Sequence, residues 1–94
     1  MMAASSSRVY RIRFTPEAQR NLEALPKAGQ RRLDARIIQL TANPRPPGVI
    51  TLQGEQGLLR LCVGDYRIIY RIEDEVLLVI VIRIGHRREV YRRR

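Results

Sequence analysis

The last ten residues of the chain, GHRREVYRRR, combine side chain types that can act on a phosphate group. They carry five arginines, the single histidine His86 and the tyrosine Tyr91. Cleavage of RNA through its own 2′-hydroxyl needs a proton acceptor, a proton donor and positive charge around the phosphorus. Arginine supplies the charge, an imidazole titrates near neutral pH, and a tyrosine can stack on a base or bond to the reacting hydroxyl. A surface position for His86 and ordinary sheet-edge packing for Tyr91 remain equally compatible with the sequence.

Other chemistries find less support in the residues. The chain has no glycine-rich phosphate loop, and its serines, Ser5 to Ser7, all stand near its start. One histidine, one cysteine and scattered carboxylates do not make a convincing set of metal ligands. We therefore expect neither a metal nor a cofactor.

The charge balance indicates a polyanionic partner. The formal net charge is +9, and Lys27 is the only basic residue that is not an arginine. Guanidinium groups bind phosphates in a bidentate manner and stack on bases, so nucleic acid, an acidic protein or an anionic surface would all fit. Charge alone does not choose among them.

The cysteine count and the apolar runs narrow the setting. Cys62 is the only cysteine, which excludes an intrachain disulfide and fits a reducing cytoplasm. Because it stands in an apolar run, we expect a small buried side chain there. The longest apolar run, Val76 to Ile82, is too short to span a bilayer. We expect residues 1–7 to be a disordered lead-in and residues 8–94 to form one domain.

Hydrophobic periodicity predicts the elements that would position these side chains. Alternation over residues 8–14 predicts a strand, and Thr15-Pro16-Glu17 is typical of a helix start. A second helix is expected over 27–42, so that the two form an αα-hairpin. Three strands follow, at 58–63, 66–72 and 76–84. The last is apolar on both faces and is expected in the middle of the sheet, covered on both faces.

The Gly64-Asp65 pair predicts a two-residue hairpin loop and thereby a register. Cys62 then lies opposite Arg67, and Arg60 lies opposite Ile69. Arg60 and Arg67 become diagonal neighbours on one surface, where long side chains can converge. Either an anion or acidic partner lies between them, or both are solvated and lean apart.

The stretches LLRLCVGDYRIIYRIEDE and IRIGHRREVY resemble the RelE/ParE superfamily of bacterial and archaeal toxins, as do TPEAQRNLEALP and NPRPPG. The resemblance implies an α+β fold of β-α-α-β-β-β type. In it, an N-terminal αα-hairpin packs on one face of a mainly antiparallel four-stranded sheet, and the other face forms a basic cleft. It also implies a type II toxin–antitoxin system, in which an acidic antitoxin neutralises the toxin.

Within that superfamily, RelE-like members cut mRNA in the ribosomal A site and ParE-like members inhibit DNA gyrase without being enzymes. By resemblance, the RelE-type reading makes this chain a metal-independent endoribonuclease that blocks translation. Leu58 stands where the RelE pattern has a lysine, and Arg60 replaces another, so proton transfer either involves His86 or gives way to positioning and charge. A non-catalytic nucleic-acid-binding module is a further alternative. The catalytic set implied is Arg60, Arg67, His86, Arg87 and Tyr91, and the RNA-binding set is Arg71, Arg83, Arg88 and Arg92.

The same resemblance implies the partners. They are a cognate acidic antitoxin, the ribosome and mRNA, with promoter DNA reached only through the toxin–antitoxin complex. No membrane partner is expected, and the location implied is the cytoplasm.

Overall fold

The computed structural model describes residues 9–54 and 57–86. The elements in chain order are β1 (Arg11–Phe14), α1 (Pro16–Glu23), α2 (Lys27–Gln39), β2 (Ile50–Thr51), β3 (Leu59–Val63), β4 (Tyr66–Glu73), the 3₁₀ turn η1 (Asp74–Val76) and β5 (Leu78–His86). The lead-in predicted at residues 1–7 lies outside the described residues. No helix in these two ranges has the length and apolar character needed to cross a bilayer.

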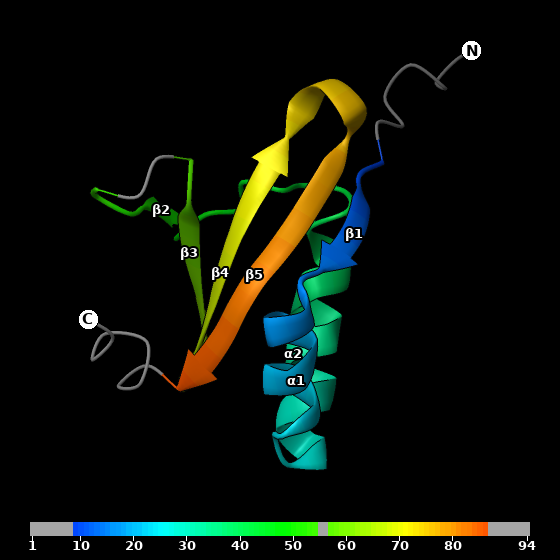
Figure 1. Ribbon diagram of the computed structural model, residues 1–94, viewed down its shortest axis with the longest axis vertical. Helices are drawn as coiled ribbons and strands as arrows, with labels where there is room; N and C mark the ends of the chain where they lie inside the picture. Colours follow the sequence, from blue (N-terminus) through cyan, green and yellow to red (C-terminus); the bar gives the residue numbers. More distant parts are fainter. Residues whose placement is uncertain (1–8, 55–56, 87–94) are drawn as a thin grey trace.

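The strands form one mixed sheet in the order β1-β5-β4-β3-β2, with both helices on one side of it (Figure 1). β1 runs parallel to β5, and the other neighbouring strands are antiparallel. The predicted α+β fold with an αα-hairpin is confirmed, but the prediction of four strands is wrong, since the sheet has five. The missed strand is β2, whose two residues are too few to show an alternating pattern.

Local chemistry explains the start of α1. The Oγ1 of Thr15 accepts a hydrogen bond from the backbone N–H of Ala18 at 3.1 Å, and Pro16 takes the first helical position. The core lies between the helices and the sheet. It contains buried apolar residues of the two helices and their ends together with alternate residues of the strands: Ala18, Leu22, Leu33, Ile37, Leu40, Leu61, Val63, Ile68, Tyr70, Val79, Val81 and Ile84.

The predicted register of the β3–β4 hairpin is confirmed pair by pair. Val63 lies opposite Tyr66, Cys62 opposite Arg67 and Arg60 opposite Ile69. Gly64 has φ +60°, the positive value that a glycine-first hairpin loop requires. The turn therefore fixes which residues of β3 and β4 face the helices.

Two expectations about burial are wrong. Cys62 is exposed, because alternation places it with Arg60 and Arg67 on the face of the sheet away from the helices. β5 does lie inside the sheet, between β1 and β4. However, within its apolar run only the helix-side residues Val79 and Val81 are fully buried, whereas Leu78 and Ile80 stay partly exposed on the other face. Within the described residues both helices lie on one face, so the apolar run of β5 is not covered twice.

A β-bulge in β5 reverses the facing of its second half. Tyr70 lies opposite Val81 but Ile69 lies opposite Arg83, so Ile82 is an extra residue in the ladder. Without the bulge, Arg83 would face the core. With it, Arg83 turns outward and Ile84 turns inward.

Side chains and backbone of the first helix hold the backbone around this bulge. The Oγ1 of Thr15 donates to the carbonyl of Ile82 at 2.7 Å, and the N–H of Thr15 donates to the carbonyl of Val81 at 2.9 Å. Six residues further along the chain, the Oδ1 of Asn21 accepts from the N–H of Ile84 at 3.0 Å. The helix cap and the outward orientation of Arg83 are therefore linked through one threonine.

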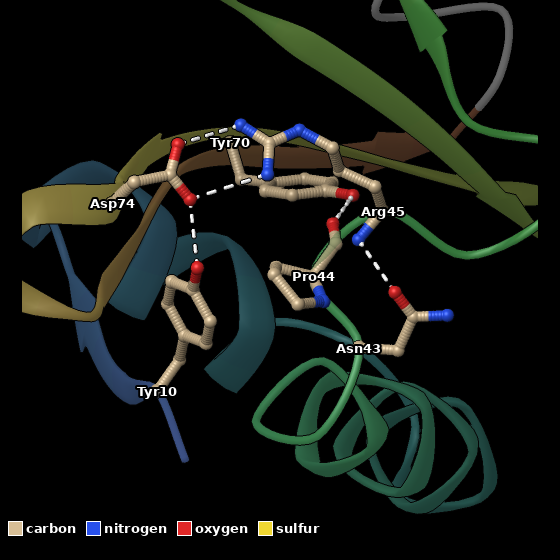
Figure 2. Close-up of polar contacts among 6 residues, drawn as sticks. All are labelled: Tyr10, Asn43, Pro44, Arg45, Tyr70 and Asp74. Atoms are coloured by element: carbon tan, nitrogen blue, oxygen red, sulfur yellow. Dashed lines mark hydrogen bonds and ion pairs between the residues drawn. The ribbon is translucent and has the colours of Figure 1, made fainter. Parts of the chain in front are cut away.

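At the opposite end of the sheet, polar contacts tie three separate segments together (Figure 2). Arg45 binds both carboxylate oxygens of Asp74, at 2.8 and 3.2 Å, and the hydroxyl of Tyr10 donates to Asp74 at 2.7 Å. Nearby, the buried hydroxyl of Tyr70 donates to the carbonyl of Pro44 at 2.7 Å. We call this group of contacts the clasp. It fixes the loop after α2 against β4 and against the turn before β5.

Candidate functional site

All six arginines on strands share one face of the sheet. The register places them together on the side away from the helices, and we call this surface the arginine face: Arg11, Arg13, Arg60, Arg67, Arg71 and Arg83. Glu73 is the only carboxylate among the strand residues of the described part of the chain. The sheet therefore carries its apolar residues toward the helices and an excess of positive charge on the other side.

The pair predicted from the hairpin register lies at the end of this surface nearest the Gly64-Asp65 loop. Arg60 and Arg67 are diagonal neighbours across the β3–β4 ladder, and both are half-buried. The Nη1 of Arg67 donates to the Sγ of Cys62, its cross-strand partner. Because two guanidinium groups lie close together here, their positions favour an anion near them.

Arg83 joins this pair from the other side of β4. Ile69 has Arg60 as its neighbour on β3 and Arg83 as its neighbour on β5. Ile69 is fully buried although it lies on the arginine face. The alkyl stems of arginines cover apolar neighbours in this way while the charged ends stay accessible. The bulge at Ile82 thus supplies the arginine that closes the row.

His86 lies on the opposite face. It pairs with Tyr66 at the end of the β4–β5 ladder, and the two rings meet edge to face with centroids 6.1 Å apart. The ring of Tyr66 in turn packs against Gly29 of α2, where an added Cβ would come within 2.8 Å of the tyrosine oxygen. The structure therefore groups His86 with the helices and does not bring it to Arg60 and Arg67.

A shallow pocket of about 360 Å³ opens beside this aromatic pair, between the end of β5 and the turn from α1 to α2. Its lining contains no Asp, Glu, Lys or Arg and includes His86, Asn21, Leu25 and Pro26. The pocket thus offers shape and a few polar atoms, but it lacks the cations that a phosphate requires.

The remaining predicted site residues, Arg87, Arg88, Tyr91 and Arg92, lie outside the described residues. Their assignment stays a prediction. Arg71 and Arg83, predicted to bind RNA, are both on the arginine face. Residues 9–54 and 57–86 contain no group of three histidine, cysteine or acidic side chains placed to hold a metal ion.

Sequence reasoning missed Arg11 and Arg13 as members of this surface. Their alternation with Ile12 and Phe14 predicted a strand, and those two apolar residues do pack toward the core. The sequence did not show that this strand lies beside β5, parallel to it. That placement depends on contacts between residues more than sixty positions apart.

Ionisation at the clasp follows from its contacts. The hydrogen bond from Arg45 to Asp74 raises the pKa of that guanidinium, with desolvation opposing the effect. Burial raises the pKa of the Tyr70 hydroxyl to about 12. Both groups are thereby kept in their ordinary charge state at neutral pH, which suits a structural role.

Comparison with known proteins gives the family. The family of ParE toxins of type II toxin–antitoxin systems, parDE, matches residues 12–91. The chain belongs to this toxin family. The match takes in both helices and every strand apart from Arg11, the first residue of β1, so the other five arginines of the arginine face lie within the part of the chain that the family shares.

Similar proteins within the superfamily carry RelE-type names. Toxin RelG of Mycobacterium tuberculosis (strain ATCC 25618 / H37Rv) is 34% identical over 89 residues, which cover 89% of this chain and 98% of RelG. The archaeal RelE–RelB complex from Pyrococcus horikoshii OT3 contains a chain with 30% identity and a TM-score of 0.74, covering 84% of this chain and 96% of that one. For the toxin–antitoxin complex RelBE2 from Mycobacterium tuberculosis, identity is 31%, the TM-score is 0.75, and coverage is 83% and 98%. The chain is thus a type II toxin of the RelE/ParE superfamily.

Proposed function

We propose that this toxin is a ribosome-dependent endoribonuclease that cuts mRNA in the ribosomal A site and so blocks translation. The observation that carries the proposal is the arginine face, where Arg60, Arg67 and Arg83 surround one small area of sheet. Similarity to RelG and to RelE chains supports the same branch of the superfamily.

The reaction proposed is attack of a 2′-oxygen on the neighbouring phosphorus. The new bond to the 2′-oxygen forms as the bond from phosphorus to the 5′-oxygen breaks, leaving a 2′,3′-cyclic phosphate and a 5′-hydroxyl. One proton leaves the 2′-hydroxyl and one reaches the departing 5′-oxygen. Negative charge builds on the phosphorane oxygens, where fixed guanidinium groups stabilise it most.

Arg60 and Arg67 would provide that stabilisation, together with Arg87, while Tyr91 would position the nucleotide. Since arginine is a poor proton acceptor, these residues work by charge and placement. The ring of His86 faces Tyr66 on the other side of the sheet. We therefore propose that charge stabilisation dominates and that proton transfer relies on water or on groups of the ribosome.

We also propose a cognate acidic antitoxin as the protein partner. The related structures from Pyrococcus horikoshii and Mycobacterium tuberculosis are toxin–antitoxin complexes. The arginine face would offer complementary charge to an acidic segment, because it carries six arginines and only one glutamate among the described strand residues. Promoter DNA would then be reached only through the complex, in the cytoplasm, with no membrane partner.

Inhibition of DNA gyrase is the second candidate function. It is favoured by the ParE name of the family that matches residues 12–91. In that case the arginine face would be a binding surface for a protein–DNA complex and no RNA would be cut.

Primer extension on a defined mRNA, with and without ribosomes carrying it, separates the two. Cuts within the A-site codon that require ribosomes support the proposal, and the triple variant Arg60→Ala, Arg67→Ala, Arg87→Ala should abolish them while staying folded by circular dichroism. Intact message together with stabilised gyrase–DNA cleavage would reject the nuclease and favour the second candidate.

A further inference from the structure

The arginine face extends well beyond the pair formed by Arg60 and Arg67. Arg60 and Arg83 flank Ile69 in one row across the strands, and Arg13 and Arg71 flank Ile80 in the next. Arg71 lies two positions after Ile69 on β4, which corresponds to about 6.8 Å along the strand. That step is close to the separation of neighbouring phosphates in an extended single strand.

The same spacing continues at both ends. Arg67 lies two residues before Ile69 on β4, beside Gly85, and Arg11 lies two residues before Arg13 on β1. Arginines therefore recur along the strand direction over roughly 20 Å, from the Gly64-Asp65 loop to the η1 turn. A single row would suit one phosphate, whereas repeated rows suit a chain of them.

The charges in the second row are suited to an external ligand. Within residues 9–54 and 57–86, Arg13 and Arg11 form no ion pair, and both are exposed. Arg71 pairs with Glu73 through its Nε at 3.1 Å, with the two side chains each about half exposed. This contact uses one edge of the guanidinium, and a phosphate can bind at the terminal amino groups.

We propose that Arg13 and Arg71, with Arg11 beyond them, form a second phosphate-binding row that holds the RNA strand about one to two phosphates away from the cleaved one. The inference rests on the proposed function only in taking single-stranded RNA as the ligand. The row serves as a track for the backbone and reads no base, because guanidinium groups bind phosphates regardless of sequence. The row also sets the direction of the RNA strand. The strand runs from Arg60 and Arg67 along β4 and β5 toward η1 and passes the β1 edge of the sheet.

The test is binding of 2′-O-methylated RNA, which cannot be cut, to the full chain at two lengths. A dinucleotide, whose single phosphate can occupy only the Arg60–Arg67–Arg83 group, and a strand of about six nucleotides, which spans the roughly 20 Å of the track, distinguish the first site from the extended track. The variant is Arg11→Ala/Arg13→Ala on β1. Its matched control is Arg20→Ala/Arg31→Ala, which removes the same charge from exposed positions of α1 and α2.

The track variant should weaken binding of the longer strand about tenfold, and the salt slope should fall by about 1.4 for two lost phosphate contacts. Binding of the shorter strand should stay at the wild-type level, and the control should match wild type at both lengths. Equal loss in the control, or wild-type affinity of the track variant for the longer strand, would overturn the proposal. Loss of affinity for polyglutamate but not for RNA would also overturn it and assign the row to an acidic protein.

These results are independent of the nuclease assay. If no message is cut but the length-dependent loss is found, the track stands and the proposed function falls. If ribosome-dependent cuts appear and the track variant binds long RNA like wild type, the proposed function stands and the track falls.

Discussion

Arginines in the clasp and on the arginine face are used in different ways. In the clasp, Arg45 is paired with Asp74. The Asp74 carboxylate accepts from both terminal nitrogens of the guanidinium and also from the hydroxyl of Tyr10. On the arginine face, six arginines share the strands with one glutamate. A guanidinium held by a carboxylate at the clasp holds the fold together, whereas several guanidinium groups gathered on one open face of the sheet create a site for an external anion. The net charge of the chain does not distinguish these two roles. The position of each arginine in the fold does, because Arg45 lies in a loop beside Asp74 whereas the others point from the strands to one face of the sheet.

The largest expected effect separates the two uses directly. Arg67→Ala should lower ribosome-dependent cleavage about 10²- to 10³-fold, because it removes a fixed donor from the developing phosphorane charge. Arg45→Ala removes the same charge from the clasp and should leave cleavage per folded molecule near wild type. Its half-exposed ion pair limits the loss in stability to about 0–1 kcal/mol. Comparable losses of cleavage in both variants would contradict the distinction.

Removing the Tyr70 hydroxyl tests the clasp. Tyr70→Phe leaves the Pro44 carbonyl without its buried donor and should cost about 1–3 kcal/mol of unfolding free energy, measured by urea denaturation. The folded-state pKa of about 12 lies above the ordinary value of 10.0. The unfolded chain therefore loses this proton first, so the stabilisation is present below pH 10 and declines as the pH rises toward 12. The difference between wild type and Tyr70→Phe should shrink over that range. A constant difference would exclude the pKa shift.

The link between the first helix and the bulge is tested by Thr15→Val, which keeps the shape of the side chain. It loses the cap to Ala18 and the bond to the Ile82 carbonyl, and should destabilise the protein by about 1–2 kcal/mol. Binding of short RNA should weaken as well, because the outward position of Arg83 depends on the bulge. Unchanged RNA affinity in this variant would show that the bulge is held without Thr15.

The smallest effect is expected at His86. General acid–base catalysis contributes about 10²- to 10⁴-fold, so a proton-transferring histidine would be costly to remove. We expect His86→Ala to lower cleavage by less than that range and to leave the shape of the pH–rate profile unchanged, since its ring faces Tyr66. Loss of one limb of the profile would instead assign the proton transfer to His86.

The sequence determined some of this arrangement and left out the rest for physical reasons. The hairpin register and the Thr15 cap depend on neighbouring residues, and both predictions are confirmed. Cys62 was misplaced because an apolar run was taken as buried on both sides, although strand alternation puts it beside Arg67.

The elements that sequence reasoning missed depend on distant contacts. Each of them involves segments far apart in the chain. They are the parallel pairing of β1 with β5, the bulge at Ile82 in the β4–β5 ladder, and the hydrogen bond from Tyr10 to Asp74. The sequence held one local sign of the bulge. Strict alternation from Val81 would have placed the charged Arg83 in the core and the apolar Ile84 outside it. The arginine face as a whole could therefore not be assembled from local patterns, although its pair Arg60 and Arg67 could.

The central claim is that the arginines of the open face of the sheet bind the RNA backbone and that Arg45 does not. Heteronuclear NMR of the arginine side-chain Nε–H groups, followed during titration with uncleavable single-stranded RNA, tests it residue by residue. The account predicts shifts at Arg60, Arg67 and Arg83, further shifts at Arg13 and Arg71 with longer strands, and none at Arg45. Shifts confined to arginines of the helices, or a shift at Arg45 as large as that at Arg67, would contradict it.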